Sequence, residues 1–139
     1  MAKPPVVADL TWLGDLRFQA VSARTSITID GDSTAGPSPV QALVFALAGC
    51  MAADVVFILT KGRHVIHALR ARLTAQRAQE NPHRILRVDL HFDVEGAVPG
   101  DAVQRAISLS REKYCSVWHS LNPDIDLQVT SDIRIPTKG

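Results

Sequence analysis

The sequence has little of several features that would identify a function directly. Its 139 residues include two cysteines and 5% aromatic residues, and they contain no CxxC or HExxH pattern. Such patterns supply most structural and catalytic zinc sites, so we expect no metal and no cofactor. The formal net charge is +1 and Lys and Arg are scattered along the chain. A nucleic-acid-binding surface needs a concentration of positive charge, so we expect no nucleic-acid partner.

The start of the chain, MAKPPVVADL, does not resemble a secretory signal. Two prolines and an acid stand where such a signal has its apolar segment. Two cysteines are also too few for the disulfide framework of a small secreted protein. We therefore expect a cytoplasmic protein whose thiols are reactive or buried rather than paired in a structural disulfide.

The remaining composition is that of an ordinary globular protein. Hydrophobic residues make up 46% and charged residues 21%, which argues against a disordered chain. A length of 139 residues is typical of one domain, and no linker is long enough to separate two. We predict a single domain over residues 1–139.

Hydrophobic periodicity predicts an α+β domain with the order βββ-α-ββ-α-β. Segments of alternating or extended character predict strands, and Ser38-Pro39 and Asp101 are suited to begin helices. The expected strands are residues 6–12, 18–22, 26–30, 69–76, 85–95 and 125–135, and the expected helices are residues 38–61 and 101–121.

The first expected helix is apolar on every side. Only Gln41 and Asp54 interrupt the apolar residues from Val40 to Leu59. Such a helix is long enough to span a bilayer, but a central acid costs about 2.5–3.5 kcal/mol on insertion, and we expect no membrane partner. One sheet of a short chain covers one side of a helix about 30 Å long. We therefore predict that a second copy of the chain covers the other side, in an obligate homodimer.

Each cysteine lies on an expected helix. Cys50 is about eleven residues from the helix start, too far for the helix dipole to activate it. A reactive thiol there needs a cation such as arginine, because a free thiol has a pKa of about 8.5. Cys115 falls at the margin of an apolar stripe, so we expect it to be partly accessible, with His119 on the same face. Both thiols could instead be buried small hydrophobes, and Asp54 could be an acid that a strand backbone or an arginine satisfies.

Two segments together resemble the OsmC/Ohr family of small thiol peroxidases. They are GPSPVQALVFALAGCMAADVV and EKYCSVWHSL, whose cysteines are 65 residues apart, and the likeness extends over essentially the whole chain. The KYCSV form is closer to the OsmC-like branch than to Ohr proper. The resemblance implies an intertwined homodimer in which sheets wrap two central helices, and an antioxidant role in the stress response.

The resemblance also implies a mechanism. Cys50 would attack an organic or inorganic hydroperoxide, Cys115 would resolve the sulfenic acid as a disulfide, and a dithiol reductant would restore both thiols. The family arginine corresponds to Arg17 in GDLRF, with Arg24 as the alternative. The family glutamate that holds this arginine is replaced by Val40.

Two other functions remain open at this point. The apolar cleft that would receive a hydroperoxide could instead bind a small lipophilic ligand without catalysis, and the cysteines would then be inert. Alternatively, the cysteine pair could serve a redox-sensing protein whose disulfide signals without turnover.

Overall fold

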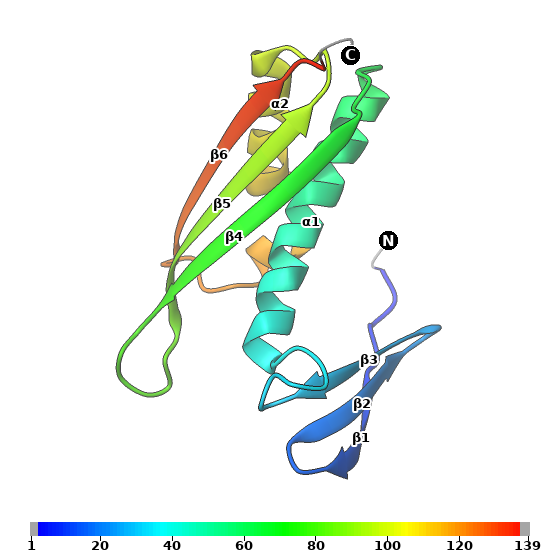
Figure 1. Ribbon diagram of the computed structural model, residues 1–139, viewed down its shortest axis with the longest axis vertical. Helices are drawn as coiled ribbons and strands as arrows, with labels where there is room; N and C mark the ends of the chain where they lie inside the picture. The colour runs from blue at the N-terminus through cyan, green and yellow to red at the C-terminus, as the bar shows by residue number, and fades with distance from the viewer. Residues whose placement is uncertain (1–2, 137–139) are drawn as a thin grey trace. The chain divides into compact units, whose positions relative to one another are not determined.

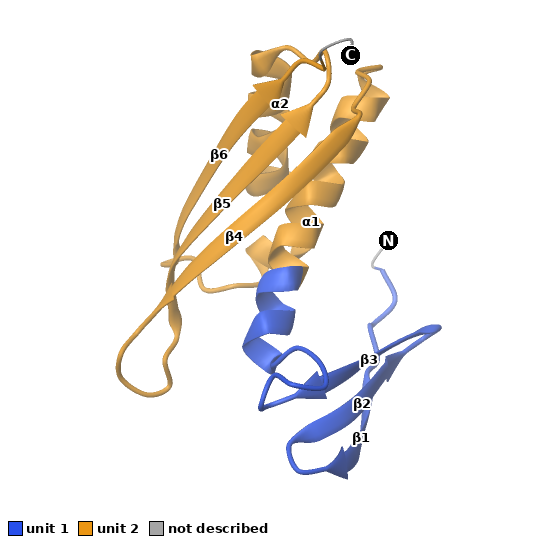
Figure 2. Ribbon diagram, viewed as in Figure 1, with its two compact units in different colours: residues 1–45 blue, residues 46–139 orange. Residues whose placement is uncertain are grey.

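The computed structural model describes residues 3–136. They form two compact units, which divide between Phe45 and Ala46 (Figure 2). The long helix α1 (Pro39–Lys61) belongs to both units, and the single domain over residues 1–139 stays a prediction. Strands and helices occur in the order predicted, which confirms the α+β class.

The first unit contains a three-stranded antiparallel meander. Its strands are β1 (Asp9–Gly14), β2 (Arg17–Ser22) and β3 (Thr25–Asp30), in the sheet order β1-β2-β3 (Figure 1). Asp15 and Ala23 have positive φ values of 48° and 51°, as the tight connections of twisted hairpins require. The predicted strands are confirmed, although the first begins later than its sequence pattern indicated.

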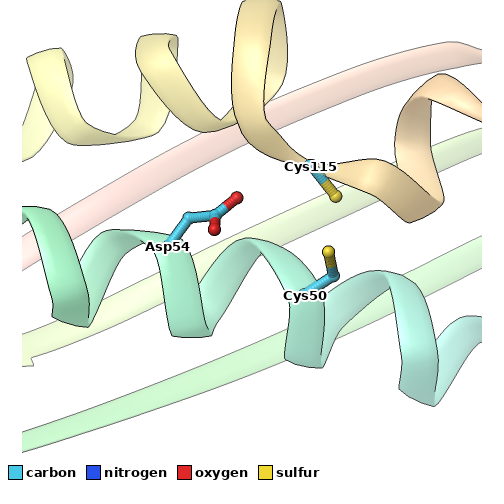
Figure 3. Close-up of side chains that lie close together, drawn as sticks. All are labelled: Cys50, Asp54 and Cys115. Carbon is cyan, nitrogen blue, oxygen red and sulfur yellow. The ribbon is translucent and has the colours of Figure 1, made fainter. Parts of the chain in front are cut away.

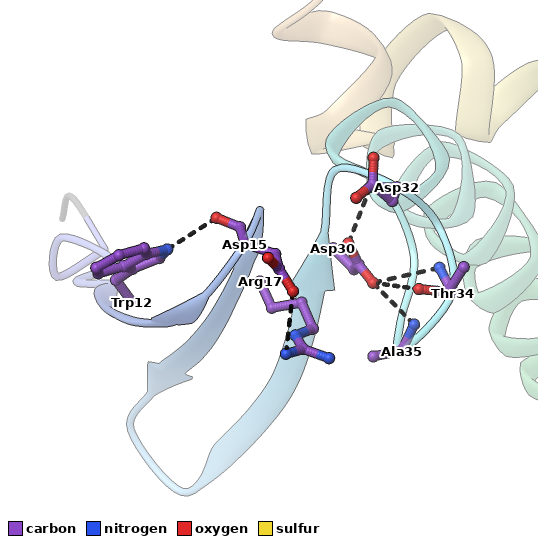
Figure 4. Close-up of polar contacts among 7 residues, drawn as sticks. All are labelled: Trp12, Asp15, Arg17, Asp30, Asp32, Thr34 and Ala35. Atoms are coloured by element: carbon purple, nitrogen blue, oxygen red, sulfur yellow. Dashed lines mark hydrogen bonds and ion pairs between the residues drawn. The ribbon is translucent and has the colours of Figure 1, made fainter.

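The loop after β3 is organised around Asp30, which is buried. Its carboxylate accepts hydrogen bonds from the backbone N–H groups of Asp32 (2.9 Å), Thr34 (3.3 Å) and Ala35 (2.9 Å), and from the Thr34 hydroxyl (2.8 Å) (Figure 4). These hydrogen bonds, that of Ala35 most strongly, lower the pKa of Asp30 to about 2.

A reciprocal pair of hydrogen bonds starts α1. The Ser38 hydroxyl accepts from the Gln41 backbone N–H (3.2 Å), and the Gln41 side chain accepts from the Ser38 backbone N–H (2.9 Å). This is a capping box, so the predicted helix start is confirmed and Gln41 has a structural role. At the other end, Lys61 lies in the last turn, where its charge complements the helix dipole.

The second unit packs helices on one face of a mixed three-stranded sheet (Figure 1). The sheet order is β4-β5-β6; β5 is antiparallel to β4 and parallel to β6. The elements are β4 (Ala68–Arg77), β5 (Ile85–Glu95), α2 (Gly100–Leu109) and β6 (Asp126–Arg134). Alternate residues of β5 are buried against helix residues, as the period of two predicted. The main contributors to this core are Val88, Leu90, Phe92 and Val94 of β5 and Leu47, Met51, Val55 and Leu59 of α1.

The prediction of one continuous helix over residues 101–121 is wrong. α2 ends at Leu109 and is followed by a single π-helical turn, η1 (Ser110–Tyr114). Cys115 then has extended backbone (φ −74°, ψ 100°), and a short helix α3 (Ser116–His119) follows. The Cys115 N–H bonds to the Ser110 carbonyl at 2.8 Å, which closes the wider turn. Apolar spacing cannot reveal such a break, because the residues on either side remain compatible with a helix.

Candidate active site

Cys50, Asp54 and Cys115 lie close together in the second unit (Figure 3). The two sulfur atoms and one Asp54 carboxylate oxygen are all within 4.8 Å of one another. Cys50 and Asp54 are one helical turn apart on α1 and therefore share a face. Cys115 approaches them because the break after η1 directs it toward α1 (Figure 3).

Cys115 is fully buried, which corrects the expectation of a partly accessible thiol. Its exposed fraction is 0%, whereas Cys50 is partly buried. The Cys115 sulfur accepts a hydrogen bond from the Trp118 backbone N–H at 3.3 Å. The sequence analysis placed Cys115 at the edge of a regular helix, and the irregular backbone turns it inward instead.

The environment of Cys115 opposes its ionisation. Burial, the largest cause, raises its pKa to about 11, although the hydrogen bond from Trp118 lowers it in part. A hydrogen bond with Cys50 and the negative charges of Cys50 and Asp54 raise the pKa further. Cys115 is therefore protonated at neutral pH, and any reaction that uses its sulfur as a nucleophile must first remove a proton.

Asp54 is held by a residue that sequence reasoning missed. The buried Ser110 hydroxyl donates to the Asp54 carboxylate at 2.8 Å. The sequence left open a strand backbone or an arginine as the partner of Asp54, and the structure gives the Ser110 hydroxyl instead. No sequence signal marks Ser110, since its position depends on the π-helical turn that it begins.

The three side chains also provide ligand types that a soft metal accepts, two thiols and a carboxylate. Tetrahedral zinc with bonds of about 2.3 Å places its sulfur ligands roughly 3.8 Å apart, and a fourth ligand would be needed. His119 does not join the group, because its Nε2 lies 3.0 Å from the Arg111 carbonyl. Two thiols and a carboxylate are ligand types that zinc accepts, but three ligands do not complete a tetrahedral site.

A cavity of about 730 Å³ borders the cluster at Asp54, and its lining residues do not include Cys50 or Cys115. It lies beside the second half of α1, α2 and η1, and Asp54 forms part of its wall. The other lining residues are Phe57, Ile58, Leu59, Lys61, Gly62, His64, Ala102, Arg105, Leu109 and Tyr114. The cavity is mainly apolar with three basic side chains, so it suits a lipophilic molecule more than a highly charged one.

The two candidate arginines belong to the first unit. Arg17 lies at the start of β2, where it forms an ion pair with Asp15 at 3.4 Å (Figure 4). Arg24 is exposed in the connection between β2 and β3. Cys50 belongs to the second unit, so an approach of either arginine to Cys50 stays a prediction.

One side of α1 is buried in the core, whereas other apolar side chains of the helix are exposed. Leu47, Met51 and Val55 are buried against the sheet, whereas Phe45 and Phe57 are each 64% exposed. By length and composition alone α1 could cross a membrane, a property that the core helices of globular proteins share. The homodimer inferred from the sequence stays a prediction.

Comparisons with known proteins agree on the family. Residues 18–130 match the family described as OsmC-like protein. Protein YhfA of Escherichia coli K12 is 42% identical over 123 residues, which cover 86% of this chain and 92% of YhfA.

Two solved structures share the fold. A hypothetical protein from Aquifex aeolicus VF5 has a TM-score of 0.90 at 23% identity and covers 97% of this chain and 100% of its own. An organic hydroperoxide resistance protein OsmC from Legionella pneumophila has a TM-score of 0.70 at 11% identity. The match covers 95% of this chain and 99% of the Legionella chain. At these identities the structures establish the fold alone. The family match over residues 18–130 and the 42% identity to YhfA show that the chain belongs to the OsmC-like family.

Proposed function

We propose that the protein is a cysteine-dependent hydroperoxide reductase in which Cys50 is oxidised and Cys115 resolves the product. The observation that carries the proposal is the position of the two sulfur atoms, within 4.8 Å of each other. A disulfide bond is about 2.05 Å long, so a small movement of α1 and the segment at Cys115 closes it. Membership of a family with structural neighbours named for organic hydroperoxide resistance supports a peroxide-stress role.

The roles of the two thiols follow from their surroundings. Cys50 is partly buried, so its sulfur has access to a peroxide, whereas Cys115 is buried and protonated. The Cys50 thiolate attacks the outer peroxide oxygen, the O–O bond breaks, and the alkoxide leaves as an alcohol after it takes up the proton that the Cys50 thiol released on ionisation. Cys115 then displaces the hydroxyl of the Cys50 sulfenic acid as water, and a dithiol reduces the resulting disulfide.

The second component of the proposal is the homodimer. The exposed phenylalanines on α1 are large apolar side chains that a second copy of the chain would cover. Small residues border them: Ala46, Gly49 and Ala53 are exposed on the same helix, and no heavy atom lies within 4 Å of a Cβ placed at Gly49. Phe57→Asp is therefore expected to give a folded monomer in sedimentation, because Phe57 contributes little to the core of its own chain.

The third component is an activating cation, which we assign to Arg17. Cys50 lies in the middle of a helix and receives little help from the dipole, and the family resemblance supplies an arginine at this position of the chain. Alkylation of Cys50 should be slower in Arg17→Ala than in the wild type, with Arg24→Ala as the matched control. Equal rates in the wild type and Arg17→Ala would show that Arg17 does not activate Cys50, and that either Arg24 or no arginine does.

The proposed reaction is tested by counting thiols. One equivalent of tert-butyl hydroperoxide should remove two thiols per wild-type chain, and a dithiol should restore both. Cys50→Ser should consume no peroxide above the rate of free cysteine. Cys115→Ser should accept one oxygen atom on Cys50 that dimedone traps and that excess peroxide converts to sulfinic acid. If Cys115 is oxidised at the wild-type rate in Cys50→Ser, the assignment of roles is reversed.

The cavity supports one further candidate function, the binding of a small lipophilic ligand. Its mainly apolar lining and volume of about 730 Å³ are suitable for such a molecule. A binding protein would take up a fluorescent fatty acid while its thiols react no faster with peroxide than free cysteine does. This result would replace the peroxidase proposal.

A further inference from the structure

The Asp54 carboxylate lies within 4.8 Å of both reacting sulfur atoms and has no role in the steps described so far. Among residues 3–136, the group of His, Cys, Asp and Glu ligand atoms within 4.8 Å of both sulfurs contains one carboxylate, that of Asp54. The Ser110 hydroxyl donates to one of its oxygens at 2.8 Å. A carboxylate has further lone pairs, so Asp54 retains the capacity to accept another proton.

The resolving step creates a need for such an acceptor. Cys115 must lose its proton to attack Cys50, but burial raises the pKa of Cys115 to about 11. At pH 7 only about one thiol in ten thousand would be ionised at that pKa. A resolving thiol with so little thiolate would be slow, and Cys50 would then be exposed to a second oxidation.

We propose that Asp54 accepts the proton of the Cys115 thiol as Cys115 attacks the Cys50 sulfenic acid. This inference rests on the proposed function, since it concerns the second step of that reaction. The position of Asp54 one turn beyond Cys50, and the Ser110 hydrogen bond that orients its carboxylate, carry the assignment.

The step balances without a further reactant. The S–H bond of Cys115 breaks and its proton moves to the Asp54 carboxylate. The Cys115 sulfur forms a bond to the Cys50 sulfur, and the S–O bond of the sulfenic acid breaks. The leaving hydroxide takes the proton from Asp54 and departs as water. One sulfur is oxidised and the other is reduced, and Asp54 returns to its initial state.

Other charged groups reach the same region without replacing Asp54. The cavity that Asp54 lines is also lined by Lys61 at the end of α1, His64 in the loop after it, Arg105 of α2 and Tyr114 of η1. Lys and Arg side chains donate hydrogen bonds and have no acceptor atom, and His64 does not belong to the group of ligand atoms within 4.8 Å of both sulfurs. The cavity gives water a route to Asp54, through which the product water can leave.

A purely electrostatic role for Asp54 predicts the opposite result on substitution. The negative charge of Asp54 contributes to the raised pKa of Cys115, although burial is the largest cause. If charge were the whole effect, Asp54→Asn would ionise Cys115 more readily and accelerate the disulfide. If Asp54 is the proton acceptor, Asp54→Asn slows the same step. The direction of the change therefore separates the two roles.

The experiment follows the two steps separately after mixing reduced protein with one equivalent of tert-butyl hydroperoxide. Quenched samples are analysed by intact mass, which distinguishes the gain of one oxygen from the loss of two hydrogens. In Asp54→Asn we expect Cys50 oxidation within about twofold of wild type and disulfide formation slower by on the order of 10²-fold. Its disulfide rate should rise about tenfold per pH unit between pH 7 and 9, because hydroxide must then ionise Cys115.

Three variants complete the test. Glu112→Gln makes the same carboxylate-to-amide change at an exposed residue of η1 and should leave both rates unchanged. Asp54→Glu should recover part of the disulfide rate. Ser110→Ala removes the hydroxyl that orients the carboxylate and should slow disulfide formation by a smaller factor. It also serves as the test if Asp54→Asn does not fold.

The outcomes separate this inference from the proposed function. A wild-type protein whose Cys50 does not react overturns the proposed function and the role of Asp54 with it. A wild type that completes both steps, with disulfide formation equally fast or faster in Asp54→Asn, overturns the role of Asp54 alone. Should Asp54→Asn be unfolded, a wild-type disulfide rate in Ser110→Ala overturns it.

Discussion

Asp30 and Asp54 are carboxylates in two different regions of the molecule, and the number of their hydrogen-bond donors differs. Asp30, in the loop after β3, accepts three backbone N–H groups and one hydroxyl. Asp54, beside the two sulfurs, accepts from Ser110 within the described part of the chain. Asp30 accepts four hydrogen bonds that fix a loop, whereas Asp54 accepts one and lies beside the two sulfur atoms, where we propose that it accepts a proton. The two acids also differ in burial, since Asp30 is buried and Asp54 is half-buried, and the acid with fewer donors is the one that could accept a proton.

The largest expected effect is on the alkylation of Cys115. With a pKa raised to about 11, Cys115 in the folded protein should react with iodoacetamide at pH 8 at least about 100-fold more slowly than in urea. Cys50 in the same sample provides the internal reference for an accessible thiol. Equal rates for the two cysteines in the folded protein would show that the region around Asp54 does not keep Cys115 protonated.

The next effect is on thermal stability and compares the two acids directly. In Asp30→Asn an NH₂ group must face an N–H donor, so we expect the Tm to fall by several degrees. In Asp54→Asn the Ser110 hydroxyl can donate to the amide oxygen, and we expect a change of about 1–2 °C. Calorimetry on both variants measures the difference. A larger loss in Asp54→Asn than in Asp30→Asn would reverse the comparison.

The smallest expected effect is in the acid dependence of stability. The pKa of Asp30 is about 2 in the folded state, below the value of about 3.9 for an unfolded aspartate. Its contribution is therefore complete above about pH 4 and is lost as the pH falls toward 2. Denaturation with urea at each pH should show the wild type and Asp30→Asn converging over this window. A constant difference from pH 6 to pH 2 would contradict the role of the Asp30 charge.

Much of the fold could be predicted because local signals determine it. The Ser38-Pro39 start of α1 and the alternation along β5 are patterns that act over a few residues. The pairing of Cys50 with Cys115 came from the family resemblance, because no local pattern indicates that two residues 65 positions apart lie close together in the fold.

The missed features depend on tertiary contacts. The π-helical turn at Ser110 changes the direction of one residue, Cys115, and so determines both its burial and its contact with Asp54. The donors around Asp30 are mostly backbone groups, whose direction the sequence of side chains does not specify. The irregular backbone at Ser110 to Cys115 therefore accounts for the main features of the candidate site that a regular pair of helices would lack.

The most direct test of the account is peptide mapping of the wild-type protein after one equivalent of tert-butyl hydroperoxide, under non-reducing conditions. We expect one linked product that joins the peptides of Cys50 and Cys115 within a single chain, with the mass of the protein lower by two hydrogens. A disulfide between two Cys50 residues of different chains, or stable oxygen addition at Cys50 with Cys115 still reduced, would contradict it.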